Sequence, residues 1–159
     1  MAAVIFVCTA NVCRSPMASA LFRRILEDKH EKADWRVESA GTWAVDDIPA
    51  SLGSQQVMKE RGIDISEHRS RRVDQEILTL FDLILTMESG HKEALRVEFP
   101  EFADRIFMLS EMVGQIYDVA DPIGRPIDEY EKTALEIEML LLTGFERIQE
   151  LVNENPVDN

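Results

Sequence analysis

The residues with the clearest chemical potential are two side chains six positions apart near the start of the chain, Cys8 and Arg14. A cysteine thiolate is a strong nucleophile, and a guanidinium can hold two oxygens of a phosphate group at once. The segment between them follows a short apolar run, Ala2 to Val7, and leads into Ser15-Pro16, a favoured helix start. Backbone N–H groups in such a loop can form a nest that binds an anion. The pattern therefore predicts a phosphate site in which the thiolate attacks phosphorus and the guanidinium stabilises the transferred group.

Short apolar runs that alternate with amphipathic segments are expected to position this loop. The runs predict four strands, at residues 2–7, 35–40, 83–86 and 105–109. The amphipathic segments predict helices at residues 15–32 (with Ser15 as N-cap), 52–61 and 88–99, and one long last helix from Asp128 to Val152 that opens with a capping box. This order predicts a single doubly wound α/β domain over residues 1–159, with a four-stranded parallel sheet covered by helices on both faces. Ligands of such sheets bind beyond the carboxyl ends of the strands, where Cys8 lies.

Composition narrows the possible functions. Two cysteines five positions apart cannot staple a fold, so their use fits a reducing compartment, and we expect a cytoplasmic protein. The three histidines occur singly and without metal-ligand spacing, so we expect no metal and no cofactor. The net charge of −13 argues against nucleic acid as a partner, and no apolar stretch is long enough to span a membrane. Residues 1–75 carry no net charge, so an anion site is expected in that half.

The loop continues as Cys-Arg-Ser-Pro over residues 13–16, and together with the Cys-x5-Arg spacing it resembles the signature of the low-molecular-weight protein tyrosine phosphatase family. The resemblance extends to residues 38–42, 62–69, 82–87 and 121–122. It implies that Cys8 forms a phosphocysteine intermediate, that Arg14 binds the phosphoryl oxygens, and that Asp121 protonates the leaving group and later activates water. It also implies that the partners are phosphorylated proteins, and we expect the enzyme to be a monomer.

The resemblance assigns roles to further residues. The rest of the phosphate-binding loop would be Thr9, Ala10, Asn11, Val12, Cys13 and Ser15. Asn11 would hold a left-handed turn supported by His68, and Ser15 would donate a hydrogen bond to the nucleophile. Cys13 would either trap the nucleophile in a reversible disulfide or serve as a small packing residue. Ala10 stands where the family usually has glycine, so we expect negative φ at this position.

The late loop Asp121-Pro122-Ile123-Gly124 leaves the substrate class open. Tyrosine-specific members usually carry aromatic residues after the proline, so Ile123 and Trp43 would have to wall the substrate here. The Asp-Pro-x-Gly loop looks more like the bacterial protein-arginine-phosphatase branch, which typically has threonine at the position of Val12. Valine has the shape of threonine without its hydroxyl. We expect phosphotyrosine-type phosphomonoesters as substrates, with phosphoarginine by the same mechanism as the alternative.

Two further classes share the loop. Thioredoxin-coupled arsenate reductases use additional cysteines downstream, and this chain has none after Cys13. A non-catalytic phosphate-binding module would need the loop but not a thiol, an arginine and a late aspartate as a set. Outside the loop, residues 68–72 hold three arginines, which we expect either to attract phosphoproteins or to form a solvated basic surface.

Overall fold

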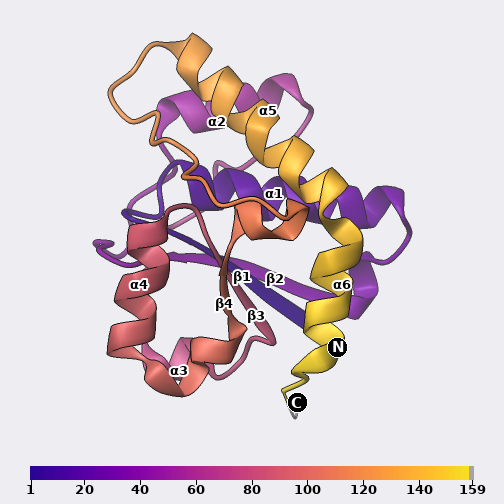
Figure 1. Cartoon of the computed structure of the whole chain (residues 1–159). Coiled ribbons are helices and arrows are strands. Elements are labelled where there is room, and N and C mark those ends of the chain that lie inside the picture. The colour runs from indigo at the N-terminus through magenta and orange to yellow at the C-terminus, as the bar shows by residue number, and fades with distance from the viewer. Residues whose placement is uncertain (158–159) are drawn as a thin grey trace.

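A four-stranded parallel sheet forms the centre of the protein, seen in a computed structural model that describes residues 1–157 (Figure 1). The strands stand in the order β2-β1-β3-β4. Their bounds are β1 Ala2–Cys8, β2 Trp35–Gly41, β3 Leu83–Thr86 and β4 Ile106–Met108. All three strand pairs are parallel, so the predicted strands and their parallel pairing are confirmed. No helix of the described range is long and apolar enough to cross a membrane.

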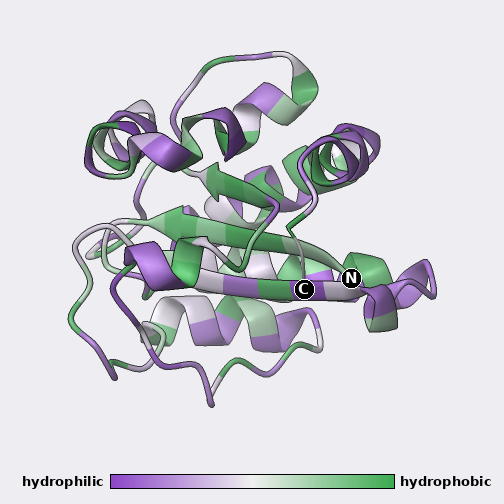
Figure 2. Ribbon diagram, turned by 90° about the horizontal axis from the view of Figure 1, so that it is seen from below, coloured by the Kyte–Doolittle hydropathy of each residue, from purple (hydrophilic) through white to green (hydrophobic). Residues whose placement is uncertain are grey.

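The central strand β1 is buried on both faces, which explains its unbroken apolar sequence. Val4 and Phe6 belong to one core cluster, while Ala3 and Ile5 belong to the other. This alternation follows from the two-residue period of side chains along a strand. In Figure 2 the strands at the centre carry mostly hydrophobic residues, and many residues of the surrounding helices are hydrophilic. The two clusters are the two layers of core that the predicted fold requires.

Helices cover both faces of the sheet, as predicted. The α-helices are α1 Arg14–Asp28, α2 Leu52–Glu60, α3 Gln75–Leu78, α4 Ser89–Glu98, α5 Ile127–Thr143 and α6 Phe145–Glu154. Three 3₁₀ helices join them: η1 Lys32–Asp34, η2 Pro100–Arg105 and η3 Leu109–Val113. The core cluster on one face is built with α1, α5 and α6, and the cluster on the other face with α3, α4 and η2. Figure 1 shows α6 and α4 on opposite sides of the strands.

The start of α1 differs from the prediction. The helix begins at Arg14 with Cys13 as its N-cap, and no side chain caps it. The expected N-cap, Ser15, lies inside the first turn and is fully buried. The helix also ends four residues earlier than predicted, at Asp28, because His30 adopts a left-handed conformation with φ 60° that a helix cannot continue through. Short α3, N-capped by an aspartate, was not predicted at all.

The single long last helix predicted from Asp128 to Val152 is wrong. Gly144 separates α5 from α6. A Cβ atom built on Gly144 would lie 2.6 Å from Cβ of Met112, so the glycine lets η3 pack directly against the break. The capping box predicted at its start is also absent. The N-cap is Pro126, and Glu131 instead pairs with Arg61 at 3.1 Å.

The strand order places the carboxyl ends of the two inner strands, β1 and β3, where the winding direction of the sheet changes. The chain runs from β1 to the edge strand β2 and then crosses to β3 on the other side of β1. Ligands of doubly wound sheets bind where the winding direction changes in this way, outside the carboxyl ends of the strands. Cys8 is the last residue of β1, and Glu88 follows β3 by two residues. Both therefore stand at the same edge of the sheet.

Candidate active site

In the loop from Cys8 to Arg14, most carbonyl groups are hydrogen-bonded to the surrounding chain, whereas the backbone N–H groups of residues 10–13 are not bonded to any described residue. Carbonyl oxygens of this loop accept hydrogen bonds from groups outside it, at 2.8 to 2.9 Å: Cys8 from Thr42 N, Thr9 from Trp43 N, Val12 from Ser51 N, and Asn11 from His68 Nε2. Within residues 1–157, the backbone N–H groups of residues 10–13 donate to no protein acceptor. Four free donors that line a loop at a helix N-terminus form an anion nest.

Asn11 holds the loop in shape from inside the protein. Its φ of 59° is left-handed, as expected, whereas Ala10 is not among the described residues with positive φ. The buried Asn11 amide donates to Ser15 Oγ at 2.7 Å and to Ser39 Oγ at 3.0 Å, and its Oδ1 accepts from the backbone N–H of Arg71 at 3.0 Å. One side chain thereby ties the loop to α1, to β2 and to the segment after α2.

Gly41 at the end of β2 permits the close approach of that strand to the loop. A Cβ atom built on Gly41 would lie 2.4 Å from the Thr9 carbonyl oxygen and 3.1 Å from the Asn11 nitrogen. Contacts of that length with backbone atoms cannot be relieved by rotating a side chain. In the sequence this glycine signals only the end of a strand, and its packing role becomes visible in the structure.

The Cys8 side chain sits at the base of the nest. Its Sγ lies 3.0 Å from Ser15 Oγ, and the residue is only 3% exposed. Asn11 donates to Ser15 Oγ, so the hydroxyl hydrogen of Ser15 points either to the sulfur or to the Ala40 carbonyl oxygen at 3.4 Å, and the sulfur is the nearer of the two. A thiolate at this point is stabilised by that hydroxyl, by the N–H groups of residues 10–13 and by the N-terminus of α1.

Arg14 is buried, and its guanidinium has one occupied edge and one free edge. Nη1 donates to Glu88 Oε2 at 2.6 Å and to the Val119 carbonyl oxygen at 2.7 Å. Nη2 has only long contacts of 3.5 Å, to Thr9 Oγ1 and Asp121 Oδ2. Nε is the one buried side-chain nitrogen or oxygen of residues 1–157 without a hydrogen-bond partner. The Nε–Nη2 edge is thus a two-donor fork without close partners, the geometry that grips two oxygens of one phosphate.

A small cavity of about 40 Å³ lies between these groups, enough for a small tetrahedral anion rather than a whole substrate side chain. It is lined by Cys8, Ala10, Val12, Cys13, Arg14, Asp121 and Ile123. Asp121 reaches it from the loop between η3 and α5. The Asp121 Oδ1 accepts from the backbone N–H of Ile123 at 3.0 Å, which leaves Oδ2 near the guanidinium. The structure brings the predicted Cys8, Arg14 and Asp121 to one cavity.

The second loop cysteine faces a different set of groups. Cys13 Sγ lies 3.2 Å from Ser51 Oγ and 3.8 Å from the Tyr130 hydroxyl. Burial raises the pKa of the Cys13 thiol above its ordinary value, and these two hydroxyl groups oppose the rise. Both cysteines are free thiols, so the disulfide between them stays a prediction.

The two residues expected to wall the substrate are placed differently. Ile123 lines the cavity and is half exposed. Trp43 is 74% exposed and does not line it; its ring packs on the Arg72 guanidinium, 5.2 Å from the ring centre. Of the predicted basic segment, Arg71 pairs with Glu38 at 3.1 Å. Because this ion pair occupies Arg71, the segment presents less free positive charge than its sequence suggests.

Glu88 and His91 at the start of α4 were not predicted as site residues. Glu88 anchors Arg14, and His91 Nε2 lies 2.8 Å from Thr9 Oγ1. A signal for them exists in the sequence, since polar residues that directly follow a buried strand lie at the carboxyl edge of a parallel sheet. That signal depends on β3 standing next to β1, which the sequence alone does not establish.

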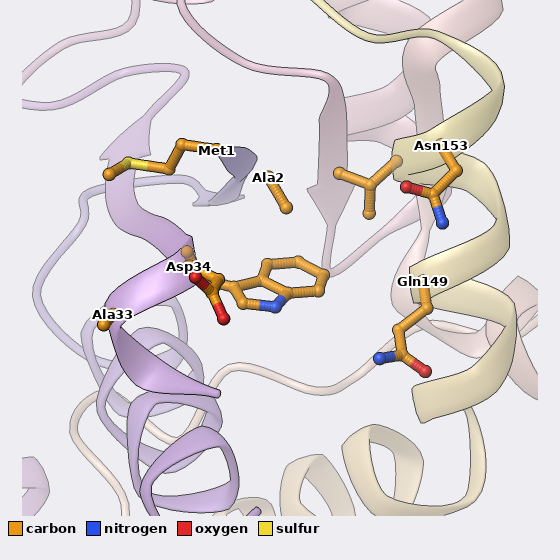
Figure 3. A pocket seen from close by; sticks show the side chains of 8 residues that line it. Met1, Ala2, Ala33, Asp34, Gln149 and Asn153 are labelled. Carbon is orange, nitrogen blue, oxygen red and sulfur yellow. The ribbon is translucent and has the colours of Figure 1, made fainter. Parts of the chain in front are cut away.

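A larger cavity of about 560 Å³ lies at the opposite end of the sheet (Figure 3). Its lining includes Met1, Ala2, Asp34, Gln149 and Asn153. This lining includes no thiol, arginine or histidine. The cavity is therefore no candidate for phosphoryl chemistry, although it is larger than the cavity at Cys8.

Comparisons with known proteins agree with this geometry. The model of the family described as "Low molecular weight phosphotyrosine protein phosphatase" matches residues 3–154. The chain is 40% identical over 147 residues to a protein-arginine-phosphatase of Geobacillus stearothermophilus, covering 92% of this chain and 95% of the relative. It is 37% identical over 134 residues to EpsP of Ralstonia nicotianae, a probable low molecular weight protein-tyrosine-phosphatase, covering 84% of this chain and 86% of the relative.

Among solved structures, the low molecular weight protein tyrosine phosphatase from T. tengcongensis superimposes with a TM-score of 0.87. It is 42% identical in sequence, and the match covers 92% of this chain and 99% of that chain. The similarity therefore extends over the whole sheet, its helices and the loop at the end of β1.

Proposed function

This chain belongs to the low molecular weight phosphotyrosine protein phosphatase family and is a cysteine-dependent protein phosphatase; we propose that Cys8, Arg14 and Asp121 carry out its reaction on phosphotyrosine side chains of proteins. The observation that supports these roles most strongly is the convergence of a thiol, a free guanidinium edge and a carboxylate on one phosphate-sized cavity. A protein that only bound phosphate would not need a thiol and a carboxylate in the same cavity.

In the first step the Cys8 thiolate attacks phosphorus along the line of the leaving oxygen. The S–P bond forms as the bond from phosphorus to the leaving oxygen breaks, and Asp121 in its protonated form gives its hydrogen to that oxygen. The Arg14 fork and the N–H groups of the nest hold the three equatorial oxygens, on which charge is concentrated in the transition state.

In the second step water attacks the phosphocysteine. The Asp121 carboxylate, left ionised by the first step, takes a proton from the water as it attacks phosphorus. The S–P bond breaks, inorganic phosphate leaves, and the sulfur recovers its negative charge. Ser15 supports this departure by donating to the thiolate as it re-forms.

The mouth of the cavity supports a phosphotyrosine substrate. Ala10, Val12 and Ile123 line it with apolar surface, and none of the three can donate or accept a side-chain hydrogen bond. A phenyl ring gains from burial against such a surface, whereas a guanidinium loses hydration without a polar partner. These contacts favour phosphotyrosine.

Phosphoarginine is the second candidate. The relative from Geobacillus stearothermophilus is a protein-arginine-phosphatase, and the chain matches it over almost the whole of both sequences. Val12 differs from threonine only by a methyl group in place of the hydroxyl, so a residue of this shape at the cavity mouth is compatible with either substrate. The same Cys8 and Asp121 chemistry would cleave the P–N bond.

The covalent mechanism is tested by Cys8→Ser. We expect its turnover of p-nitrophenyl phosphate to fall at least about a thousandfold, while it still binds sulfate in the nest. Parent-level turnover by Cys8→Ser would exclude the sulfur as nucleophile. Asp121→Asn supplies the matched test of the acid, because its loss should be larger for substrates whose leaving group is more basic.

The substrate class is tested by kcat/KM for matched phosphotyrosine and phosphoarginine peptides. We expect a preference for phosphotyrosine of more than about tenfold, or roughly 1.4 kcal/mol. Val12→Thr should shift the ratio toward phosphoarginine, because it supplies a hydroxyl at the cavity mouth. A preference of the parent for phosphoarginine would replace the first candidate with the second.

We also propose that the enzyme works in the reducing cytoplasm and as a monomer. The reaction requires Cys8 as a free thiol, and both cysteines are free. All the groups that form the cavity come from a single chain.

A further inference from the structure

We propose that His91 is a positioning residue for the phosphate site, acting through Thr9 and Glu88 to hold the free edge of Arg14 toward the anion. The inference rests on the proposed function, since it assigns His91 to the same phosphate site. His91 is 6% exposed and belongs to α4, a helix that contributes no lining residue to the cavity.

His91 closes the N-terminal cap of α4. Glu88 is the N-cap, and its side chain accepts the backbone N–H of His91. In return the backbone N–H of Glu88 donates to His91 Nδ1 at 3.1 Å. The residue in the position of His91 is usually glutamate or glutamine in such a capping box. Here an imidazole closes the box, and it has a second nitrogen on the far side of the ring.

That second nitrogen reaches the phosphate-binding loop. His91 Nε2 lies 2.8 Å from Thr9 Oγ1. Because Nδ1 accepts a hydrogen bond, the hydrogen of the neutral ring is on Nε2, and the ring donates to Thr9. Thr9 follows Cys8 directly, and its hydroxyl is 3.5 Å from Arg14 Nη2. The ring thus connects the start of α4 to the loop beside the nucleophile.

The other member of the cap anchors the guanidinium. Glu88 Oε2 accepts from Arg14 Nη1 at 2.6 Å and lies 3.4 Å from His91 Nε2. One capping box therefore fixes both Glu88 and Thr9, the groups on either side of the Arg14 head. If the ring is removed, the connection between Glu88 and Thr9 is lost, and the Nε–Nη2 fork is held less firmly.

The neutral ring is required for this arrangement. The charged groups that face it are Arg14 from α1, Glu88 from its own helix, and Asp118 and Asp121 from the loop before α5. Burial and Arg14 lower the pKa of His91 below its ordinary value, and the three carboxylates oppose the shift. Protonation would remove the acceptor for the Glu88 N–H and put a second cation beside Arg14. The connection to the loop is therefore expected to fail in acid.

The experiment measures competitive inhibition by sulfate, which keeps its double negative charge across the pH range used. We expect His91→Ala to weaken sulfate binding about tenfold, the effect of one or two lost hydrogen bonds near a charged group. His91→Gln should restore most of it, because glutamine closes the capping box and offers an amide N–H toward Thr9. Glu93→Ala, on an exposed position of the same helix, is the control and should bind sulfate as the parent does.

Acid provides a second readout. The ratio of the parent inhibition constant to that of His91→Gln should rise as pH falls from about 7 to 5, because only the parent carries a ring that protonates. In a double-mutant cycle, Thr9→Val and His91→Ala should together cost less than the sum of the two single losses.

Unchanged sulfate binding in His91→Ala, a flat pH ratio, or strict additivity with Thr9→Val would overturn the inference. If His91→Ala does not fold, the pH ratio of His91→Gln decides. Failure of the proposed function has a different signature: sulfate would then not compete with substrate in the parent enzyme itself.

Discussion

Replacing Asn11 with alanine should lower the free energy of unfolding by far more than the small change in side-chain volume suggests. The Asn11 side chain makes three buried hydrogen bonds, to Ser15, to Ser39 and to the Arg71 backbone. Each is worth about 1 kcal/mol net. Alanine also tolerates φ 59° less well than asparagine, at a cost of about 1 kcal/mol. The free energy of unfolding should therefore fall by about 4 kcal/mol, a large share of the roughly 5–15 kcal/mol typical of a domain.

The assay is denaturant unfolding of the parent and of Asn11→Ala, with kcat/KM measured in parallel below the transition. Asp47→Ala is the matched control, because Asp47 is exposed and has φ 66°, so it carries the left-handed conformation without the buried hydrogen bonds. It should lose only about 1 kcal/mol. If Asn11→Ala costs no more than Asp47→Ala, the buried amide network does not stabilise the loop and the reasoning fails.

Three further outcomes are expected. Gly53→Ala should cost about 1–3 kcal/mol in denaturant unfolding, because its new Cβ would lie 2.7 Å from the Tyr130 ring; a neutral effect would mean that the ring moves freely. Burial lowers the pKa of His68 below its usual 6.5, so the unfolded chain binds this proton first, and the free energy of unfolding should fall as pH drops below 6.5. His68→Asn should lose that part of the pH dependence. If the free energy of unfolding of the variant changes with pH as steeply as that of the parent, the assignment to His68 is wrong. In a Cys8→Ser background, iodoacetamide should modify Cys13 at least about tenfold more slowly than a free thiol at pH 7, because burial raises the pKa of Cys13. Mass spectrometry measures the rate of modification. A rate equal to that of a free thiol would show that the Cys13 thiol is accessible.

The sequence supports predictions that depend on local pattern. Four short apolar runs correspond to the four strands, and the loop between the first run and its helix contains the cysteine and arginine that the structure brings together. Errors occurred where a local signal competed with packing. Ser15-Pro16 looks like a helix start, but the helix begins at Arg14, because the Met17 N–H donates to the carbonyl oxygen of Cys13 at 3.3 Å. Gly144 interrupts a continuous amphipathic stripe because η3 packs against it.

What the sequence alone determined is the chemistry of the loop and the class of fold, because residue types, spacing and periodicity are local properties that one chain segment expresses by itself. Only the tertiary structure decided which distant groups complete the site. Glu88 occupies one edge of Arg14 and leaves the other edge free because β3 stands beside β1. His91 reaches Thr9 for the same reason, and Gly41 lies against the loop because β2 pairs with the other edge of β1. Such contacts join residues tens of positions apart, and their energies depend on distances that no local pattern encodes.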